Sequence, residues 1–65
     1  MKGIVTRWLD MRGYGFIQTD EMDKDVFVHH TGLKNRGDLA TDEKVKFDVQ
    51  ETEKGPRAIN VEVIE

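Results

Sequence analysis

The sequence predicts an all-β protein, a small closed or partly closed barrel of five antiparallel strands. Five short segments are rich in β-branched and aromatic residues and carry apolar side chains at every second position. No segment sustains a helical period over more than a turn. Because a five-stranded sheet in 65 residues has little chain left to cover its edges, closure into a barrel is the favoured arrangement.

The predicted strands follow one another along the chain and are separated by glycine-containing or acidic turns. They are residues 3–9, 14–19, 25–30, 44–52 and 57–64. The period of two is clearest in the last two strands, in Val45, Phe47 and Val49 and again in Ile59, Val61 and Val63. Residues 53–56 contain Gly and Pro, which favour a turn, so these strands are expected to form a hairpin. Residues 31–43 are expected to be a loop with one helical turn, in which Leu33 and Leu39 bury their side chains.

Length and composition restrict the class of protein. We expect one domain over residues 1–65, because so short a chain has room for one small core. The absence of cysteine excludes disulfides and thiolate metal sites and suits a reducing compartment. The longest apolar run, Val26–Val28, is far shorter than the roughly 20 residues of a membrane span. A cytoplasmic protein without a membrane partner is therefore expected.

The net charge of −3 argues against a purely electrostatic nucleic-acid binder. Its distribution is uneven, however. Residues 1–18 and 26–37 each carry a net charge of +2, and these segments hold most of the aromatic residues. Five basic side chains are candidates to border an aromatic surface and hold phosphates: Arg7, Arg12, Lys34, Arg36 and Arg57.

Two neighbouring predicted strands carry rings at alternate positions. One face collects four ring side chains: Tyr14, Phe16, Phe27 and His29. The opposite face collects Ile17, Val26 and Val28 together with Gly15. A buried histidine needs partners for both ring nitrogens, whereas aliphatic side chains need none. The aliphatic face is therefore expected to form the core, and the rings are expected to face solvent.

A contiguous exposed apolar patch indicates an interaction surface, and rings suit a partner with flat faces. Unpaired nucleobases have such faces, and stacking on an aromatic side chain contributes roughly 1 to 3 kcal/mol per base. The predicted function is binding of single-stranded RNA or DNA by a monomer, with no cofactor and no small-molecule substrate. Trp8 and His30 are further candidates for contacts with the nucleic acid.

Two motifs give the chain a family resemblance. Residues 12–17, RGYGFI, match most of the first ribonucleoprotein motif, and residues 25–30, DVFVHH, look like the second motif of cold-shock proteins. The chain resembles this family over nearly its whole length. The resemblance implies an oligonucleotide-binding (OB) barrel and an RNA chaperone that disfavours secondary structure. It places the four rings on the family's stacking positions and Arg12 on its basic position.

The chain also departs from the family pattern. Trp8 precedes Gly13 by five residues where the family usually has six, and an ungapped alignment of residues 3–5 moves Trp8 onto the following aromatic position. The loop after the second motif is shorter and lacks the usual phenylalanine. Fewer stacking subsites than in a typical member of the family are therefore expected.

Other functions fit the sequence less well. A barrel of the Src-homology-three kind, with an aromatic groove for proline-rich peptides, is the alternative reading. An enzyme is a more distant one, since the chain has neither serine nor cysteine to act as a nucleophile. No metal site is expected, because His29 and His30 are neighbours on a predicted strand and should point to opposite faces.

Overall fold

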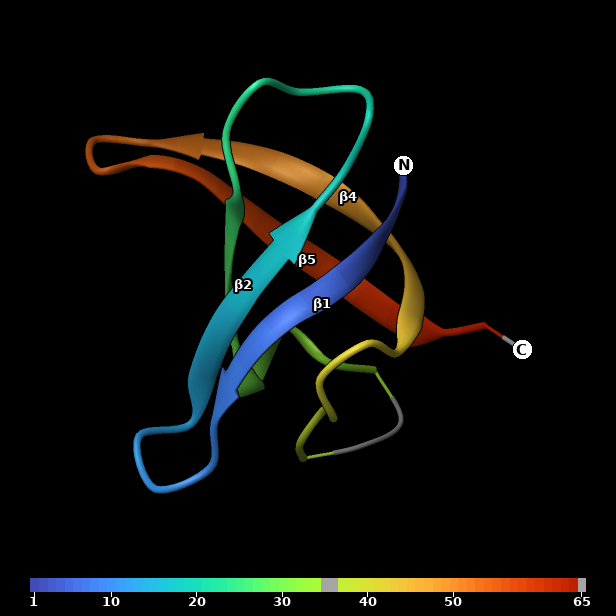
Figure 1. Ribbon diagram of the computed structural model, residues 1–65. Coiled ribbons are helices and arrows are strands. Elements are labelled where there is room, and N and C mark those ends of the chain that lie inside the picture. Colours follow the sequence, from blue (N-terminus) through green and yellow to red (C-terminus); the bar gives the residue numbers. More distant parts are fainter. Residues whose placement is uncertain (35–36, 65) are drawn as a thin grey trace.

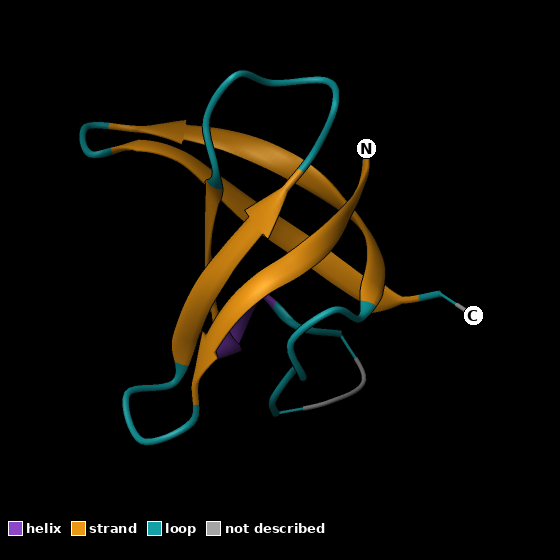
Figure 2. Ribbon diagram, in the orientation of Figure 1, coloured by secondary structure: helices purple, strands orange, loops and turns teal. Residues whose placement is uncertain are grey.

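Five strands form a closed barrel in the computed structural model, which describes residues 1–34 and 37–64 (Figure 1). The strands are β1 (Lys2–Leu9), β2 (Tyr14–Gln18), β3 (Val26–His29), β4 (Lys44–Thr52) and β5 (Gly55–Val63). One 3-10 helix, η1 (His30–Gly32), follows β3 (Figure 2). The order around the barrel is β1-β2-β3-β5-β4, and β4 pairs with β1 to close it. The predicted all-β, five-stranded barrel is confirmed.

One strand pair differs from the expected antiparallel arrangement. β3 and β5 run parallel, with Phe27 opposite Arg57 and Val28 opposite Ala58, whereas the other four pairs are antiparallel. A closed ring with an odd number of strands cannot alternate in direction all the way around, so one pair must be parallel. This pair is where two segments distant in sequence meet.

The strand ends differ from the predicted ones at two places that matter for the site. The third strand ends at His29 rather than at residue 30, because the chain turns into η1. The last strand begins at Gly55, so the hairpin loop is only Glu53 and Lys54. Gly55 has a φ of 118°, which favours glycine, and the Thr52 hydroxyl donates to its carbonyl oxygen at 2.7 Å.

The interior of the barrel is aliphatic, as the alternation predicts. Ile17, Val26 and Val28 are fully buried. Among residues 1–34 and 37–64, the buried apolar side chains of the core are Val5, Ile17, Val26, Val28, Leu39, Val45, Phe47, Ala58 and Val61. Leu33 packs against this core from the loop that follows η1. In the part of the chain that the structure describes, no helix is long and apolar enough to cross a membrane.

An irregularity in β1 changes which of its side chains face the core. Val5 pairs with Ile17, but the register shifts before Arg7, which pairs with Phe16. Thr6 is the extra residue of this bulge, and a bulge interrupts the simple alternation of faces. Directly paired residues share a face of the sheet. Arg7 therefore lies on the outer face with Phe16, and Trp8 lies on the inner face with its partner Gly15.

Gly15 allows β1 and β2 to approach closely. A β-carbon at this position would collide with the Arg7 carbonyl oxygen and lie 2.8 Å from Cε3 of Trp8. The first motif thus places a glycine where the barrel has no room for a side chain. The Trp8 ring occupies the space that a side chain at position 15 would need.

Candidate nucleic-acid interface

The four predicted rings lie together on the outer face of β2 and β3. Tyr14 is opposite His29 and Phe16 is opposite Phe27 in the antiparallel register. The ring centroid of Phe27 lies 5.6 Å from that of Tyr14, 6.1 Å from that of Phe16 and 6.4 Å from that of His29. All four side chains are half-buried. They form one continuous surface, here called the ring platform, with Phe27 at its centre.

Two arginines flank the platform on the neighbouring strands. Arg7 on β1 pairs with Phe16, and Arg57 on β5 pairs with Phe27. The four residues Arg7, Phe16, Phe27 and Arg57 therefore form a row across four adjacent strands, with a guanidinium group at each end. A cation beside each ring can hold a phosphate while a base stacks on the ring.

The two histidines lie side by side, and the expectation that they point to opposite faces is wrong. Their ring centroids are 4.3 Å apart, because His30 belongs to η1 and no longer follows the strand alternation. The backbone N–H of His30 donates to the Gly13 carbonyl at 2.8 Å, and its ring lies against Gly13, which has a φ of 72°. His30 thus extends the platform toward the β1–β2 turn.

Partial burial lowers the pKa of the His29 imidazole, and the positive charges of His30 and Arg57 act in the same direction. His29 therefore stays neutral to a lower pH than an unperturbed histidine, whose pKa is about 6.5. A neutral imidazole presents a flat ring with one N–H donor and one acceptor nitrogen.

Trp8 does not join the platform. It is half-buried, packs against the core and faces Gly15, and its Nε1 is buried. The bulge in β1 is the reason: it turns Trp8 inward and puts Arg7 and Leu9 on the outer side, beside Phe16 and Tyr14. The sequence sign of this change is the spacing: Trp8 precedes Gly13 by five residues, and the ungapped alignment of residues 3–5 moves it to the following aromatic position.

The three remaining basic candidates lie in different surroundings. Arg12 is exposed in the turn between β1 and β2, two residues before Tyr14. Lys34 instead forms an ion pair with Glu62 at 3.1 Å, which Lys46 joins at 3.3 Å. Hydrogen bonds from Lys34 and then Lys46 lower the pKa of the Glu62 carboxyl. Arg36 lies outside the described residues.

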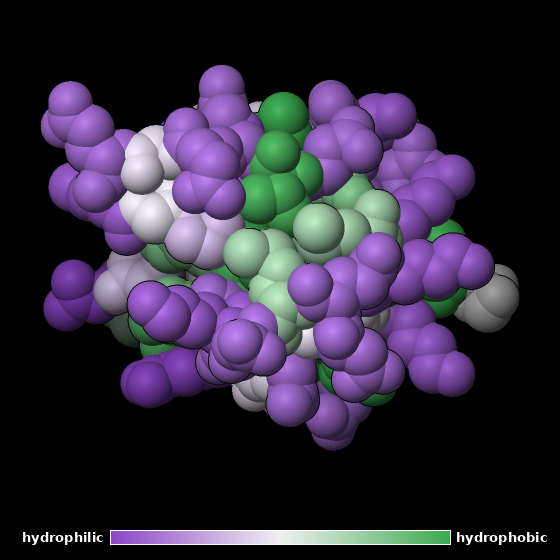
Figure 3. All heavy atoms as spheres, turned by 90° about the horizontal axis from the view of Figure 1, so that it is seen from above, coloured by the Kyte–Doolittle hydropathy of each residue, from purple (hydrophilic) through white to green (hydrophobic). Residues whose placement is uncertain are grey.

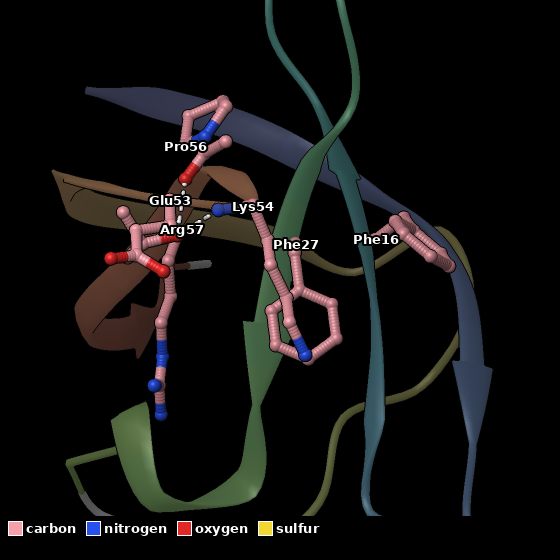
Figure 4. Close-up of a pocket in the computed structure, with 8 residues that line it drawn as sticks. Phe16, Phe27, Glu53, Lys54, Pro56 and Arg57 are labelled. Atoms are coloured by element: carbon pink, nitrogen blue, oxygen red, sulfur yellow. Dashed lines mark hydrogen bonds between the residues drawn. The ribbon is translucent and has the colours of Figure 1, made fainter.

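A groove of about 660 Å³ runs beside the platform, between its two phenylalanines and the β4–β5 hairpin (Figure 4). Its hairpin wall is formed by residues 52–57, and Figure 4 shows Lys54 extending from this wall toward Phe27. Sequence reasoning missed Glu53, Lys54 and Pro56 as part of the site. Only the pairing of β3 with β5 brings them to Phe27, and nothing local to residues 53–56 indicates it.

The surface around the barrel is mostly polar. Seen from above, it shows hydrophilic side chains around a central hydrophobic strip (Figure 3). Within residues 1–34 and 37–64, no group of three or more His, Cys, Asp or Glu side chains is placed to hold a metal ion. The rings of the platform and the arginines beside them form a surface suited to a partner with flat faces and negative charge.

Comparison with known proteins identifies the family. The sequence profile of the 'Cold-shock' DNA-binding domain matches residues 1–64. The chain belongs to the cold-shock domain family. A cold shock-like protein of Aquifex aeolicus is 45% identical over 65 residues, which cover 97% of this chain and 93% of that protein. The cold shock-like protein CspC of Escherichia coli K12 is 39% identical over 66 residues, covering 98% of this chain and 96% of CspC.

A solved structure supports the fold of this cold-shock domain. The structure titled drosophila Unr CSD456 superposes with a TM-score of 0.80 at 22% identity. The match covers 98% of this chain but only 26% of that longer chain, so it bears on the fold alone. The protein is therefore a nucleic-acid-binding protein of the cold-shock family with an OB-type barrel, and the proline-peptide alternative has no support.

Proposed function

We propose that this cold-shock domain binds single-stranded RNA or DNA by stacking unpaired bases on Tyr14, Phe16, Phe27 and His29, and that it acts as an RNA chaperone. The observation that supports this most is the continuous ring platform on the outer face of β2 and β3. Bases in a duplex have their faces covered, so only unpaired bases can stack on it. Trapping them would prevent hairpins from re-forming, without a chemical reaction, in the cytoplasm and as a monomer.

Stacking supplies most of the binding free energy in this proposal. The net charge of −3 gives little general attraction to phosphates. Three or four stacked bases at roughly 1 to 3 kcal/mol each, less the cost of ordering the strand, correspond to a Kd on the order of micromolar. Arg7 and Arg57 at the two ends of the central row, with Arg12 nearby, would hold the phosphates.

The decisive test compares four fluorescent ligands by anisotropy: oligouridine and oligothymidine of about seven nucleotides, a hairpin duplex, and a proline-rich peptide. Anisotropy is preferable to tryptophan quenching because Trp8 lies on the inner side of the sheet. Binding of both single strands with weak or absent binding of the duplex supports the proposal. Binding of the peptide alone would overturn it.

Salt dependence separates stacking from phosphate contacts. If Arg7, Arg12 and Arg57 each hold one phosphate, log K should fall with log salt concentration with a slope of about −2. Replacing Arg57 with glutamine should reduce this slope by about 0.7. A wild-type slope much steeper than about −2 would mean that further groups hold phosphates. An unchanged slope in the Arg57→Gln variant would mean that Arg57 holds none.

The Glu53→Gln variant should bind single strands more tightly than the wild type. Glu53 lines the groove beside Phe27, and its carboxylate repels a phosphate that passes along this wall. Because the side chain is exposed, we expect a gain of about 0.2 to 1 kcal/mol at low salt. Glu51→Gln is the matched control, since Glu51 makes the same charge change but lines a different depression, beside Asp20 and Met22. Equal gains in both variants would mean that only net charge matters.

A further inference from the structure

A chain of hydrogen bonds joins the ring platform to β5 through Thr31. Nη2 of Arg57 donates to the Thr31 hydroxyl oxygen at 3.1 Å, and that oxygen lies 2.9 Å from Nδ1 of His29. The backbone N–H of Thr31 also donates to Nδ1 of His29, at 3.3 Å. Thr31 lies in η1, directly after the strand that carries the rings, and so connects two elements of the site.

The directions of these bonds determine where the His29 proton is. A guanidinium group only donates, so the Thr31 hydroxyl accepts from Arg57 and has its own hydrogen free for Nδ1 of His29. The Thr31 backbone N–H points at the same nitrogen. The backbone N–H can only donate, so a proton on Nδ1 would oppose it. Nδ1 is therefore the acceptor, the hydroxyl hydrogen can donate to the same nitrogen, and Nε2 carries the hydrogen of the neutral ring.

The groups around His29 act against a second proton on its ring. Among the residues that the structure describes, the titratable or charged side chains beside it are His30 in η1, Arg57 on β5 and Tyr14 on β2. Partial burial lowers the pKa of His29 most, and the positive charges of His30 and Arg57 lower it further. The electrostatics and the hydrogen bonds therefore favour the same neutral state.

We propose that Thr31 is a positioning residue of the nucleic-acid site, which holds His29 as the neutral Nε2–H tautomer in a fixed orientation. The ring then offers a base both a flat face and one N–H donor, which suits a carbonyl oxygen of the base or a phosphate oxygen. Arg57 is tied to the same threonine, so its guanidinium and the His29 ring are ordered together. This inference rests on the proposed function, because it describes how the same platform is organised.

The state of His29 is measured by NMR of its ring nitrogens in the free protein. We expect an unprotonated signal for Nδ1 and a protonated signal for Nε2 in the wild type. Thr31→Val keeps the side-chain shape but removes the hydroxyl, one of the two donors to Nδ1, so it should raise the pKa of His29 and increase the share of the Nδ1–H tautomer. Thr31→Ser keeps the hydroxyl and should restore both properties. A protonated Nδ1 in the neutral wild type, or an unchanged His29 in Thr31→Val, would overturn the inference.

Binding of heptauridine at pH 7.5 provides the functional readout. Thr31→Val should bind about two- to tenfold more weakly than the wild type, as expected from loss of one hydrogen bond, with rescue by Thr31→Ser. Thr41→Val, at an exposed threonine in the turn before β4, is the matched control and should bind normally. Wild-type affinity in Thr31→Val would overturn the positioning role. If the wild type binds no oligonucleotide, the proposed function fails, whereas the nitrogen signals still decide the state of His29 separately.

Discussion

Replacing Phe27 with alanine is expected to weaken binding of single-stranded oligonucleotides by about 1 to 3 kcal/mol, with a much smaller loss in the free energy of unfolding. Phe27 is half-buried at the centre of the platform, and its ring neighbours those of Tyr14, Phe16 and His29. Truncation removes the central stacking surface without opening the barrel interior. Phe16→Ala should behave in the same way. Anisotropy titration and urea denaturation measure the two effects separately.

A destabilised Phe27→Ala that binds normally when folded would show that the ring serves packing and not recognition. Tyr14→Phe is a useful control on the same surface, because it keeps the ring and removes only the hydroxyl. It should retain most of the affinity if stacking is the main contribution.

For Phe47→Ala we expect a large loss in the free energy of unfolding, and not the loss of a stacking surface. This phenylalanine is only 3% exposed, and its ring lies against Gly3 inside the barrel. Truncation of a buried phenylalanine costs about 3 to 5 kcal/mol. A 65-residue domain has only about 3 to 10 kcal/mol of stability in total, so the substitution should remove a large part of it. Urea or thermal unfolding followed by circular dichroism measures this loss.

The two phenylalanines test the assignment of faces because the substitution is chemically identical. Phe27→Ala should lose binding and keep its fold, whereas Phe47→Ala should lose stability. The milder Phe47→Leu should remain folded and bind oligonucleotides as the wild type does. If Phe47→Ala were stable and Phe27→Ala unfolded, the outer and inner faces would be inverted.

The placement of the ring platform could be predicted from the sequence because it depends on local geometry. Side chains alternate between the faces of a strand, so Tyr14 and Phe16 must share a side opposite Ile17. The preference of aliphatic residues for the interior then settles which side is the core. The same local reasoning located all five strands to within two residues at each end.

Local reasoning failed where the alternation is interrupted. The bulge at Thr6 turned Trp8 toward the core, and the start of η1 placed the His30 ring beside that of His29. The spacing of Trp8 from the first motif hinted at the first event, but the alternation of residues in a strand indicates neither. A bulge is decided by how β1 fits against β2, and the end of β3 by the bonds that Thr31 makes.

The sequence by itself determined the strands, the core face and the rings of the platform, since each follows from alternation over a few residues. Only the tertiary structure decided what surrounds the rings: Arg57 and the hairpin groove beside Phe27, and the bond of Arg57 to Thr31. These neighbours come from the parallel pairing of β3 with β5. That register is set by closure of the whole barrel, and therefore by contacts between segments that no local pattern connects.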